Sequence, residues 1–296
     1  MTHTPNAESL ERSNRGVALH LGGEAARARA EYGAALAADP ANATALNNLG
    51  FLEAQEGNLA AAIACYERAL ASDGGRATAW TNLGNARAAQ GDAAGALAAL
   101  GRAVELNPAS ALAWDSLAKA SLLAGRPADA ERAWGRAAAV APPDARRLVG
   151  LATAVAAQDR LAEAAAILRR ATRIAPADPH AWAQLGLVLF VRHDLGSAVD
   201  ALGRAAGLDP ANAAVRHTLA LAWLARGDAA QAEQELEGVL ALEPGLAGAR
   251  TDLGVVLLAR GQATAALAHL EGEDPRAAHY RALAQAALRE GGAHGP

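Results

Sequence analysis

Hydrophobic and small residues recur along the chain with a period of 34 residues. Advancing in steps of 34, eight successive segments begin at Ser9, Ala43, Ala77, Ala111, Ala145, Pro179, Ala213 and Ala247. Position 20 of every segment is alanine, namely Ala28, Ala62, Ala96, Ala130, Ala164, Ala198, Ala232 and Ala266. Position 7 is leucine in every segment after the first, and position 8 is always small. So many matching columns indicate a tandem repeat, in which each unit packs against its neighbours.

Each segment carries the signals of two helices and of the turns between them. Position 15, where the first helix should end, is glycine in six segments and Asp159 or His193 in the other two. Glycine readily adopts the left-handed conformation that ends many helices, and Asp and His are enriched there among the other types. Capping residues follow at position 16, at Asn58, Asp92, Asp194 and Asp228. Proline at position 32 ends the second helix, and another capping residue comes two positions later, at Asn42, Ser110, Asp144, Asp178 and Asn212.

The small columns predict how the two helices of a segment pack. A helix pair closes tightly only where small side chains let the backbones approach. Position 8 and the alanine at position 20 meet that need, and large side chains surround them. These are Trp80, Trp114 and Trp182 at position 4, and Tyr32, Tyr66, Leu100, Trp134, Leu168, Leu202 and Leu236 at position 24.

These columns closely resemble the tetratricopeptide repeat (TPR) family, whose signature runs Trp–Leu–Gly–Tyr–Ala–Phe–Ala–Pro over 34 residues. The resemblance spans about Ser9 to Tyr280. It implies an all-α fold: an α-solenoid of about eight helix-turn-helix repeats in a right-handed superhelix, with the first helices lining a concave groove. One departure is position 11, which is usually aromatic in the family and is mixed here, with Glu53, Arg87 and Ser121 among its residues.

The repeat frame also predicts the organisation of the chain. We expect repeats at residues 9–42, 43–76, 77–110, 111–144, 145–178, 179–212, 213–246 and 247–273. A disordered tail, residues 1–8, should precede them, and a capping helix, residues 274–290, should follow, with a second disordered tail over residues 291–296. Arg12 and Arg15 replace apolar residues in the first repeat, as expected where no earlier repeat covers that face. Asp274-Pro275 comes three residues early, so the last second helix should be short, and Gly291-Gly292 should end the capping helix.

Composition adds little to this picture. The chain is 52% hydrophobic but only 3% aromatic, because most of the hydrophobic residues are alanine, which favours helix. A net charge of −4 gives no reason to expect nucleic acid as a partner. The longest apolar run, residues 185–191, is far short of a membrane-spanning helix, so we expect no membrane insertion. The first residues show no signal-peptide pattern, so a cytoplasmic location is expected.

The candidate binding residues lie on one face of the first helices. Positions 2, 5, 6, 9, 12 and 13 share that face by the 3.6-residue period, and in the TPR family it lines the concave groove. The face is polar toward the N-terminus and partly apolar toward the C-terminus. The candidate peptide-binding residues are Asn14, Asn47, Asn48, Asn82, Asn85, Lys119, Gln184, Leu187, Phe190, His217, Leu221 and Leu224.

Three of these amides occupy position 6 of consecutive repeats: Asn14, Asn48 and Asn82. A primary amide can donate to and accept from one peptide group at once, so a row of them could hold an extended peptide by its backbone. The row resembles the asparagine ladder in the repeat superhelix of O-linked N-acetylglucosamine transferase. The alternative is that these amides are simply solvated. The apolar residues likewise admit two interpretations, as packing between repeats or as a trough for an amphipathic helix of a partner or of the chain itself.

No pattern in the sequence favours catalysis. The eight histidines show no metal-ligand spacing, the single Cys65 has no flanking base, and the glycines belong to the repeat, so we expect no cofactor, no metal and no enzymatic activity. The basic residues with which chaperone-binding repeats capture a C-terminal carboxylate are missing. The favoured hypothesis is a scaffold that binds a protein or peptide partner in the groove. The alternatives are a regulatory or chaperone-like assembly subunit that docks an enzyme, and a self-associating homo-oligomer.

Overall fold

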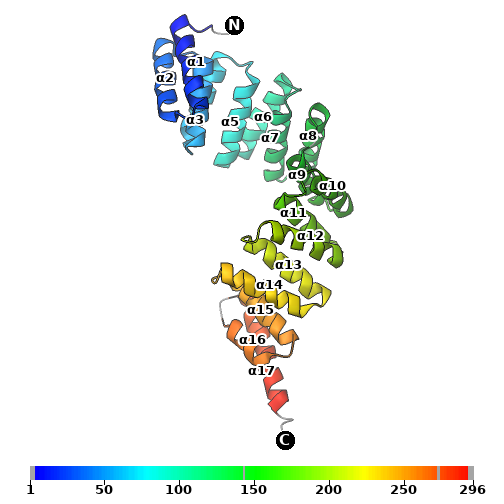
Figure 1. The fold of residues 1–296 in the computed structure, drawn as a ribbon. Helices are drawn as coiled ribbons and strands as arrows, with labels where there is room; N and C mark the ends of the chain where they lie inside the picture. The colour runs from blue at the N-terminus through cyan, green and yellow to red at the C-terminus, as the bar shows by residue number, and fades with distance from the viewer. Residues whose placement is uncertain (1–3, 143, 272–273, 293–296) are drawn as a thin grey trace. The chain divides into compact units, whose positions relative to one another are not determined.

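The computed structural model describes residues 4–142, 144–271 and 274–292 (Figure 1). All regular structure in these ranges is helical, which confirms the predicted all-α class. The helices are α1 Ala7–Leu21, α2 Ala25–Ala38, α3 Ala43–Gln55, α4 Leu59–Ser72, α5 Ala77–Gln90, α6 Ala93–Leu106, α7 Ala111–Leu123, α8 Pro127–Val140, α9 Ala145–Ala156, α10 Leu161–Ile174, α11 Pro179–Val191, α12 Leu195–Leu208, α13 Ala213–Arg226, α14 Ala229–Leu242, α15 Ala247–Ala259, α16 Ala263–His269 and α17 Pro275–Gly292.

The helices pack as hairpins in chain order. Each odd-numbered helix from α1 to α13 packs most extensively against the even-numbered helix that follows it, and α15 packs about equally against α14 and α16, so each pair forms one repeat with a first and a second helix. α17 packs on α15 and α16 and covers the end of the last hairpin. The chain divides into two compact units, residues 1–143 with α1–α8 and residues 144–296 with α9–α17. A solenoid of helix-turn-helix repeats is therefore the architecture of each unit.

The turns inside the hairpins have the predicted conformation. All six glycines at position 15 have positive φ, between 70° and 94°. Asp159 and His193, which replace glycine in two repeats, both have φ of 61°. They are the positive-φ residues other than glycine within the ranges given above, which confirms that position 15 requires the left-handed conformation.

The capping prediction is correct for the first helices and only partly correct for the second. Side chains of Asn42, Ser110, Asp144, Asp178 and Asn212 each accept a hydrogen bond from a backbone N–H of the helix they precede. The four residues at position 16 do precede their helices, but of these only Asp92 accepts such a bond, from Gly95 at 2.8 Å. The other three residues have ψ between 60° and 69°, lower than the ψ values of the first-helix caps. In this conformation their side chains do not accept from the backbone N–H groups at the start of the helix.

Close packing inside each hairpin depends on the small residues at positions 8 and 20. Every alanine at position 20 is fully buried. A Cβ built on Gly84 at position 8 would lie 2.5 Å from Cγ of Leu100 at position 24, and one on Gly16 would lie 2.5 Å from Cε1 of Tyr32. A Cβ built on Gly50, Gly186 or Gly254 would likewise lie too close to the side chain at position 24 of the same repeat. The sequence prediction of small against large is thus confirmed at these positions.

Tryptophan at position 4 forms a hydrogen bond to the turn between repeats, in addition to packing. The indole N–H donates to the carbonyl six residues earlier, in the turn that joins one repeat to the next. Arginine replaces tryptophan at position 4 of the two last repeats and donates to the corresponding carbonyl. The pairs are Trp80 with Gly74, Trp114 with Pro108, Trp182 with Pro176, Arg216 with Pro210 and Arg250 with Pro244, at 2.6 to 3.0 Å. An N–H donor is therefore the property that both residue types share at this position.

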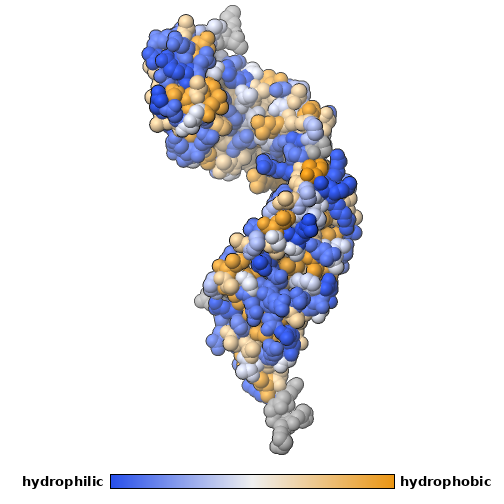
Figure 2. Space-filling model, viewed as in Figure 1, coloured by the Kyte–Doolittle hydropathy of each residue, from blue (hydrophilic) through white to orange (hydrophobic). Residues whose placement is uncertain are grey.

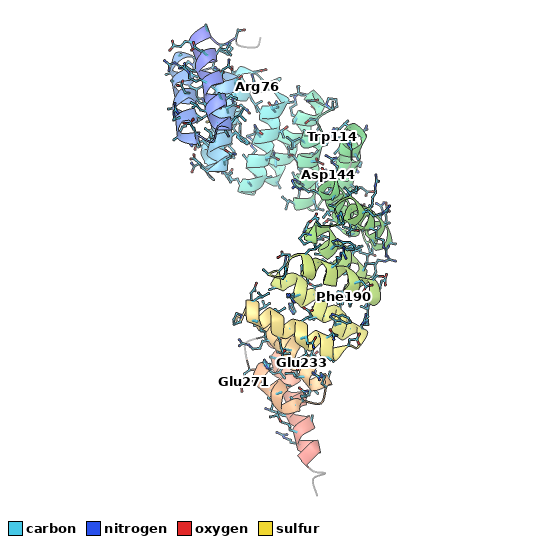
Figure 3. All side chains as sticks on the ribbon, in the orientation of Figure 1. Arg76, Trp114, Asp144, Phe190, Glu233 and Glu271 are labelled. Atoms are coloured by element: carbon cyan, nitrogen blue, oxygen red, sulfur yellow. The ribbon has the colours of Figure 1, made fainter. Side chains whose placement is uncertain are left out.

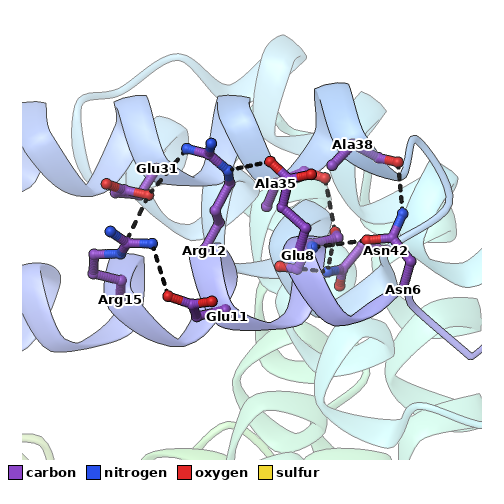
Figure 4. Close-up of polar contacts among 10 residues, drawn as sticks. Asn6, Glu8, Glu11, Arg12, Arg15, Glu31, Ala35, Ala38 and Asn42 are labelled. Carbon is purple, nitrogen blue, oxygen red and sulfur yellow. Dashed lines mark hydrogen bonds and ion pairs between the residues drawn. The ribbon is translucent and has the colours of Figure 1, made fainter.

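The N-terminal end is ordered earlier in the chain than predicted. α1 begins at Ala7, so the expectation of a disordered tail over residues 1–8 is wrong for its last two residues. Asn6 caps the helix by accepting from the Ser9 N–H at 2.8 Å, and its own amide donates to the Ala38 carbonyl at 2.8 Å (Figure 4). This double contact fixes the start of the helix against the end of α2. Residues 1–3 lie outside the described residues.

As predicted, Arg12 and Arg15 lie on the face of α1 that no earlier repeat covers. Arg12 pairs with Glu8 at 3.0 Å, and Arg15 pairs with Glu11 at 3.3 Å (Figure 4). Both guanidinium groups also approach Glu31 of α2, at 3.9 and 3.7 Å. Charged side chains therefore cover the face that an earlier repeat covers elsewhere in the stack.

The C-terminal end differs from the prediction in one respect. α16 is short, as expected, and α17 begins at Pro275, close to the expected residue 274. The helix continues through Gly292, so the expectation that Gly291-Gly292 would end it and open a disordered tail is wrong for these two residues. Glycine lowers helix stability but does not exclude helix, so the two glycines are compatible with a helix that extends this far. Residues 293–296 lie outside the described residues.

Candidate peptide-binding face

The first helices form the inner side of the stack within each unit. α1, α3, α5 and α7 contact one another in succession, as do α9, α11 and α13. Among the described residues, no second helix makes a contact of that extent with the next second helix. Helices on the side that curves inward lie closer together, so the predicted binding residues lie on the inner face of their own unit. We call this the first-helix face and treat it separately in each unit.

The central amides of the first unit form a hydrogen-bonded chain. The Asn82 side chain on α5 donates to the Asn47 side-chain oxygen on α3 at 3.0 Å, and the Asn47 amide donates to the Asn48 side-chain oxygen at 3.2 Å. The Asn48 side chain also interacts with the hydroxyl of buried Tyr32 on α2. All three amides are half-buried. The contact between repeats therefore joins position 6 to position 5 of the preceding repeat, where the sequence had suggested a row along position 6 alone.

Other predicted residues of the first unit face solvent. Asn14 on α1, Asn85 on α5 and Lys119 on α7 are exposed. The sequence analysis missed an aromatic contact on this face: the rings of His20 and Phe51 stack with their centroids 5.6 Å apart. Phe51 occupies position 9 and His20 position 12, both of which belong to the groove positions, so the helical period alone could have found them.

Gln184 and Leu187 lie together in the second unit, where two depressions meet. One depression, of about 350 Å³, lies between α9, α10 and α11, and the other, of about 140 Å³, lies between α11, α12 and α13. Both are lined by Gln184 and Leu187, and the larger is also lined by exposed Val191, which the sequence analysis missed. Two neighbouring depressions of this size can take successive side chains of an extended segment.

Two of the other predicted apolar residues belong to the packing between helices. Phe190 on α11, labelled in Figure 3, is half-buried and packs against two hydrophobic clusters, one with residues of α9 and α10 and the other with residues of α12 and α13. Leu224 on α13 is likewise packed against the cluster of the last repeats, while Leu221 is half-buried. Packing thus accounts for Phe190 and Leu224, and Leu187 is the predicted apolar residue that faces solvent most clearly.

His217 lies in a charged cluster at the end of the second unit. Its Nε2 is 2.7 Å from Oδ2 of Asp252, a buried carboxylate on α15. Arg276 of α17 donates to the other oxygen of Asp252 at 2.8 Å and to Asp274 at 3.0 Å. The side-chain hydrogen bond from Arg276, together with one from its backbone N–H, holds the pKa of Asp274 below its usual range. His217 and Asp252 occupy positions 5 and 6 of successive repeats, the same relation as Asn47 and Asn82. The cluster ties α17 to the repeats.

Metal ligands, a reactive cysteine and a membrane-spanning helix can each be checked among the described residues. Within residues 4–142, 144–271 and 274–292, no group of three histidine, cysteine or acidic side chains could hold a metal ion. Burial raises the pKa of the Cys65 thiol, which makes its reactive thiolate scarcer. Nor do these ranges contain a helix with the length and apolar character needed to cross a membrane. Hydrophobic and hydrophilic residues are interspersed over the visible surface of each unit (Figure 2).

The fold and the repeat columns define a helical-repeat protein. The Tetratricopeptide repeat family matches residues 21–79, 81–146, 124–179 and 149–213, together more than half of the chain. The chain therefore belongs to the tetratricopeptide repeat family, as its sequence columns predict. No curated protein matches the sequence.

Several solved structures share the fold. PilW, a type IV pilus biogenesis factor, is 20% identical, with a TM-score of 0.65 over 73% of this chain and 98% of its own. A tetratricopeptide repeat protein from Parabacteroides merdae is 17% identical, with a TM-score of 0.63 over 85% and 100%. YrrB, described as a TPR protein with an unusual peptide-binding site, is 18% identical, with a TM-score of 0.52 over 62% and 95%. At these identities the likeness establishes the fold.

Proposed function

We propose that the chain is a non-catalytic scaffold that holds an extended segment of a protein partner along its first-helix face. Membership of the tetratricopeptide repeat family supports a role in protein–protein interaction. The observation that carries the finer proposal is the pair of depressions that meet at Gln184 and Leu187, beside exposed Val191. In YrrB, a protein of the same fold, a peptide-binding site has been described.

Leu187 supplies the apolar part of this site, and Gln184 supplies the polar part. Leu187 is 43% exposed although it lies between two depressions, so a partner side chain can cover apolar surface that is now in contact with water. The Gln184 amide can donate to and accept from the backbone of an extended segment. Together they favour a peptide bound by its backbone, with apolar side chains in the two depressions.

The amides of the first unit offer a separate surface of the same kind on the first-helix face of that unit. Asn82 uses one donor hydrogen on Asn47, which leaves its second hydrogen and its oxygen for a ligand. Exposed Asn14 and Asn85 offer complete amides. The contact of Asn47 with Asn82 holds two of these groups in fixed positions, which reduces the ordering cost when a ligand binds.

The test is peptide selection on the purified full-length chain, followed by affinity measurements with the best peptide. Leu187→Asp places a charge between the two depressions, and we expect it to weaken binding by about tenfold or more. Leu208→Asp is the matched control, because Leu208 is 38% exposed but lies on the second helix α12. For a peptide that binds the first unit, Asn14, Asn48 and Asn82 changed together to Ala should weaken binding while the helical circular dichroism is retained. Equal affinities for Leu187→Asp and Leu208→Asp would contradict the proposal.

A further inference from the structure

Besides the two depressions of the second unit, a pocket lies within the first unit, between α6, α7 and α8. It has a volume of about 420 Å³ and is lined by Leu97 of α6, by Trp114, Leu117 and Ser121 of α7, and by Arg126, Asp129, Arg132, Ala133 and Arg136 at the start of and along α8. Trp114, labelled in Figure 3, belongs to the position-4 column that faces the turn between repeats. None of the lining residues belongs to the predicted groove set, so this pocket is separate from the first-helix face.

Ser121, at position 11 of the fourth repeat, is a small residue of the pocket lining. Ser121 is buried, and its hydroxyl donates to the Leu117 carbonyl at 2.7 Å, so it fills little space and needs no further partner. Position 11 in the second repeat is Glu53, which pairs with Arg29 of α2 and closes the corresponding place with an ion pair. Ser121 is the smaller side chain at this place, and it lines the pocket together with Trp114.

Positive charge surrounds the opening. Three guanidinium groups line the pocket, and Asp129 is the one carboxylate among its lining residues. Arg126 lies 2.5 Å from one oxygen of Asp129, and Arg132 pairs with the other. Arg132 and Arg136 are exposed, so their guanidinium groups can turn toward an added anion. The lining therefore combines an aromatic floor with a net positive rim.

We propose that this pocket binds an acidic peptide segment of a partner protein, with a bulky apolar side chain against Trp114 and a neighbouring carboxylate on Arg132 and Arg136. The volume is within the range of binding pockets, and the apolar floor of Leu97, Trp114 and Leu117 suits a ring. Arginine is the residue type best suited to hold a carboxylate, because its planar fork can donate two parallel hydrogen bonds. The net positive rim selects an acidic segment.

The second unit contains a natural comparison at the same repeat positions. A pocket of about 540 Å³ there is lined by Trp182 and Arg204, the counterparts of Trp114 and Arg136. In that pocket the Arg204 guanidinium lies 5.7 Å from the centre of the Trp182 ring, and it therefore occupies the face that a ligand ring would use. Leu189 stands where the first unit has Ser121. The proposal therefore assigns the acidic segment to the first unit.

The experiment measures the fluorescence anisotropy of a labelled peptide that contains the run Asp-Phe-Glu in a Gly-Ser context, with the full-length chain. Arg136→Glu should weaken binding by about tenfold or more. Arg204→Glu is the matched control, since both arginines are exposed at the same repeat position and carry the same charge change, and it should alter affinity by no more than about twofold. Ser121→Phe should abolish binding, because the new ring fills the pocket.

Two further arms make the outcome decisive. A peptide with Ala in place of Phe, and one with Asn and Gln in place of the two acids, should each bind far more weakly than the probe. Leu187→Asp should leave binding of this probe unchanged, which separates the pocket from the first-helix face. Equal losses for Arg136→Glu and Arg204→Glu would indicate general attraction between charges and overturn the proposal. Unchanged binding to Ser121→Phe, with its helical signal intact, would also overturn it.

Discussion

At the scale of single residues, the fold depends on glycines at the points where two helices contact each other closely. Gly84 permits α5 and α6 to approach because a Cβ there would meet Leu100 at 2.5 Å and the Ala96 carbonyl at 3.2 Å. Gly101, in the next helix, has no neighbouring atom within 4 Å of the corresponding position. Two glycines of neighbouring helices therefore have opposite physical roles. One is required by packing, and the other only adds flexibility.

We predict opposite effects for the same substitution at these two sites. Gly84→Ala should lower the free energy of unfolding by roughly 1–3 kcal/mol, because the added methyl group overpacks a rigid contact. Gly101→Ala should raise it by roughly 0.5–1 kcal/mol, because alanine restricts the unfolded chain and favours helix. Chemical denaturation monitored by circular dichroism measures both. Equal and same-signed changes would show that position 8 is not a close-packing site.

Glu53 provides a prediction for acid pH. Burial raises the pKa of this carboxyl, but hydrogen bonds from Arg29 and Asn58, together with the charge of Arg29, outweigh that effect and leave the pKa below its usual value. A carboxyl with a lowered pKa stabilises the fold above its unfolded pKa, and that contribution is lost as the pH falls through the folded value. Glu53→Gln should therefore be less stable than the parent at neutral pH and lose less stability on acidification. A parallel loss in both proteins, measured as melting temperature from neutral to acid pH, would refute this role.

At the scale of helices and turns, local signals determine where each element begins and ends. Asn42 is buried and accepts from the backbone N–H groups of Thr44 and Ala45 at 3.1 and 3.0 Å, and its amide donates to Ser9 Oγ at 2.8 Å. It therefore caps α3 and links it to α1. Asp194 precedes α12 without such a bond.

The two caps should differ in their contribution to stability. Asn42→Ala should lower the free energy of unfolding by roughly 1–2 kcal/mol, because it removes a cap and leaves buried groups without a partner. Asp194→Ala should cost clearly less, since it removes only the attraction of a carboxylate to the helix N-terminus. Denaturation curves of the two variants are directly comparable. An equal loss for both would contradict the difference in geometry.

The sequence predicts these local features well because each depends on residues that are close together in the sequence. The left-handed turns at Asp159 and His193 and the cap at Asn42 follow from residue type and spacing alone. The pairing of Asn82 with Asn47, and of His217 with Asp252, joins different repeats and depends on how side chains turn across the contact. The pocket beside Ser121 was not predicted for a similar reason. A small residue at position 11 signals a departure, but only packing shows whether neighbours fill the space.

At the scale of the whole molecule, the chain offers surfaces of different chemistry on two compact units. The first unit carries half-buried and exposed amides on its first-helix face and an arginine-lined pocket between α6, α7 and α8. The second unit carries the depressions around Gln184 and Leu187. Each surface lies within one unit. A scaffold of this kind can bind different parts of a partner through separate sites, so that weak contacts add up.

Self-association is the alternative that solution mass can test. A scaffold for other proteins should remain a single chain of 29.9 kDa as its concentration rises. Light scattering after size-exclusion chromatography, over a wide range of concentrations, measures this directly. A mass that increases with concentration would favour a homo-oligomer, and the affinity measurements would then need to be repeated at the concentration of each species.

The central claim is that the partner segment lies on the first-helix face, and site-specific photo-cross-linking tests it most directly. A benzophenone amino acid is placed at position 187 on α11 in one protein and at position 208 on α12 in another, and each is irradiated with the selected peptide. Because Leu187 lies between the two depressions, we predict a cross-linked product from position 187 and none from position 208. Capture from position 208 with none from position 187 would place the partner on the second helices and contradict the account.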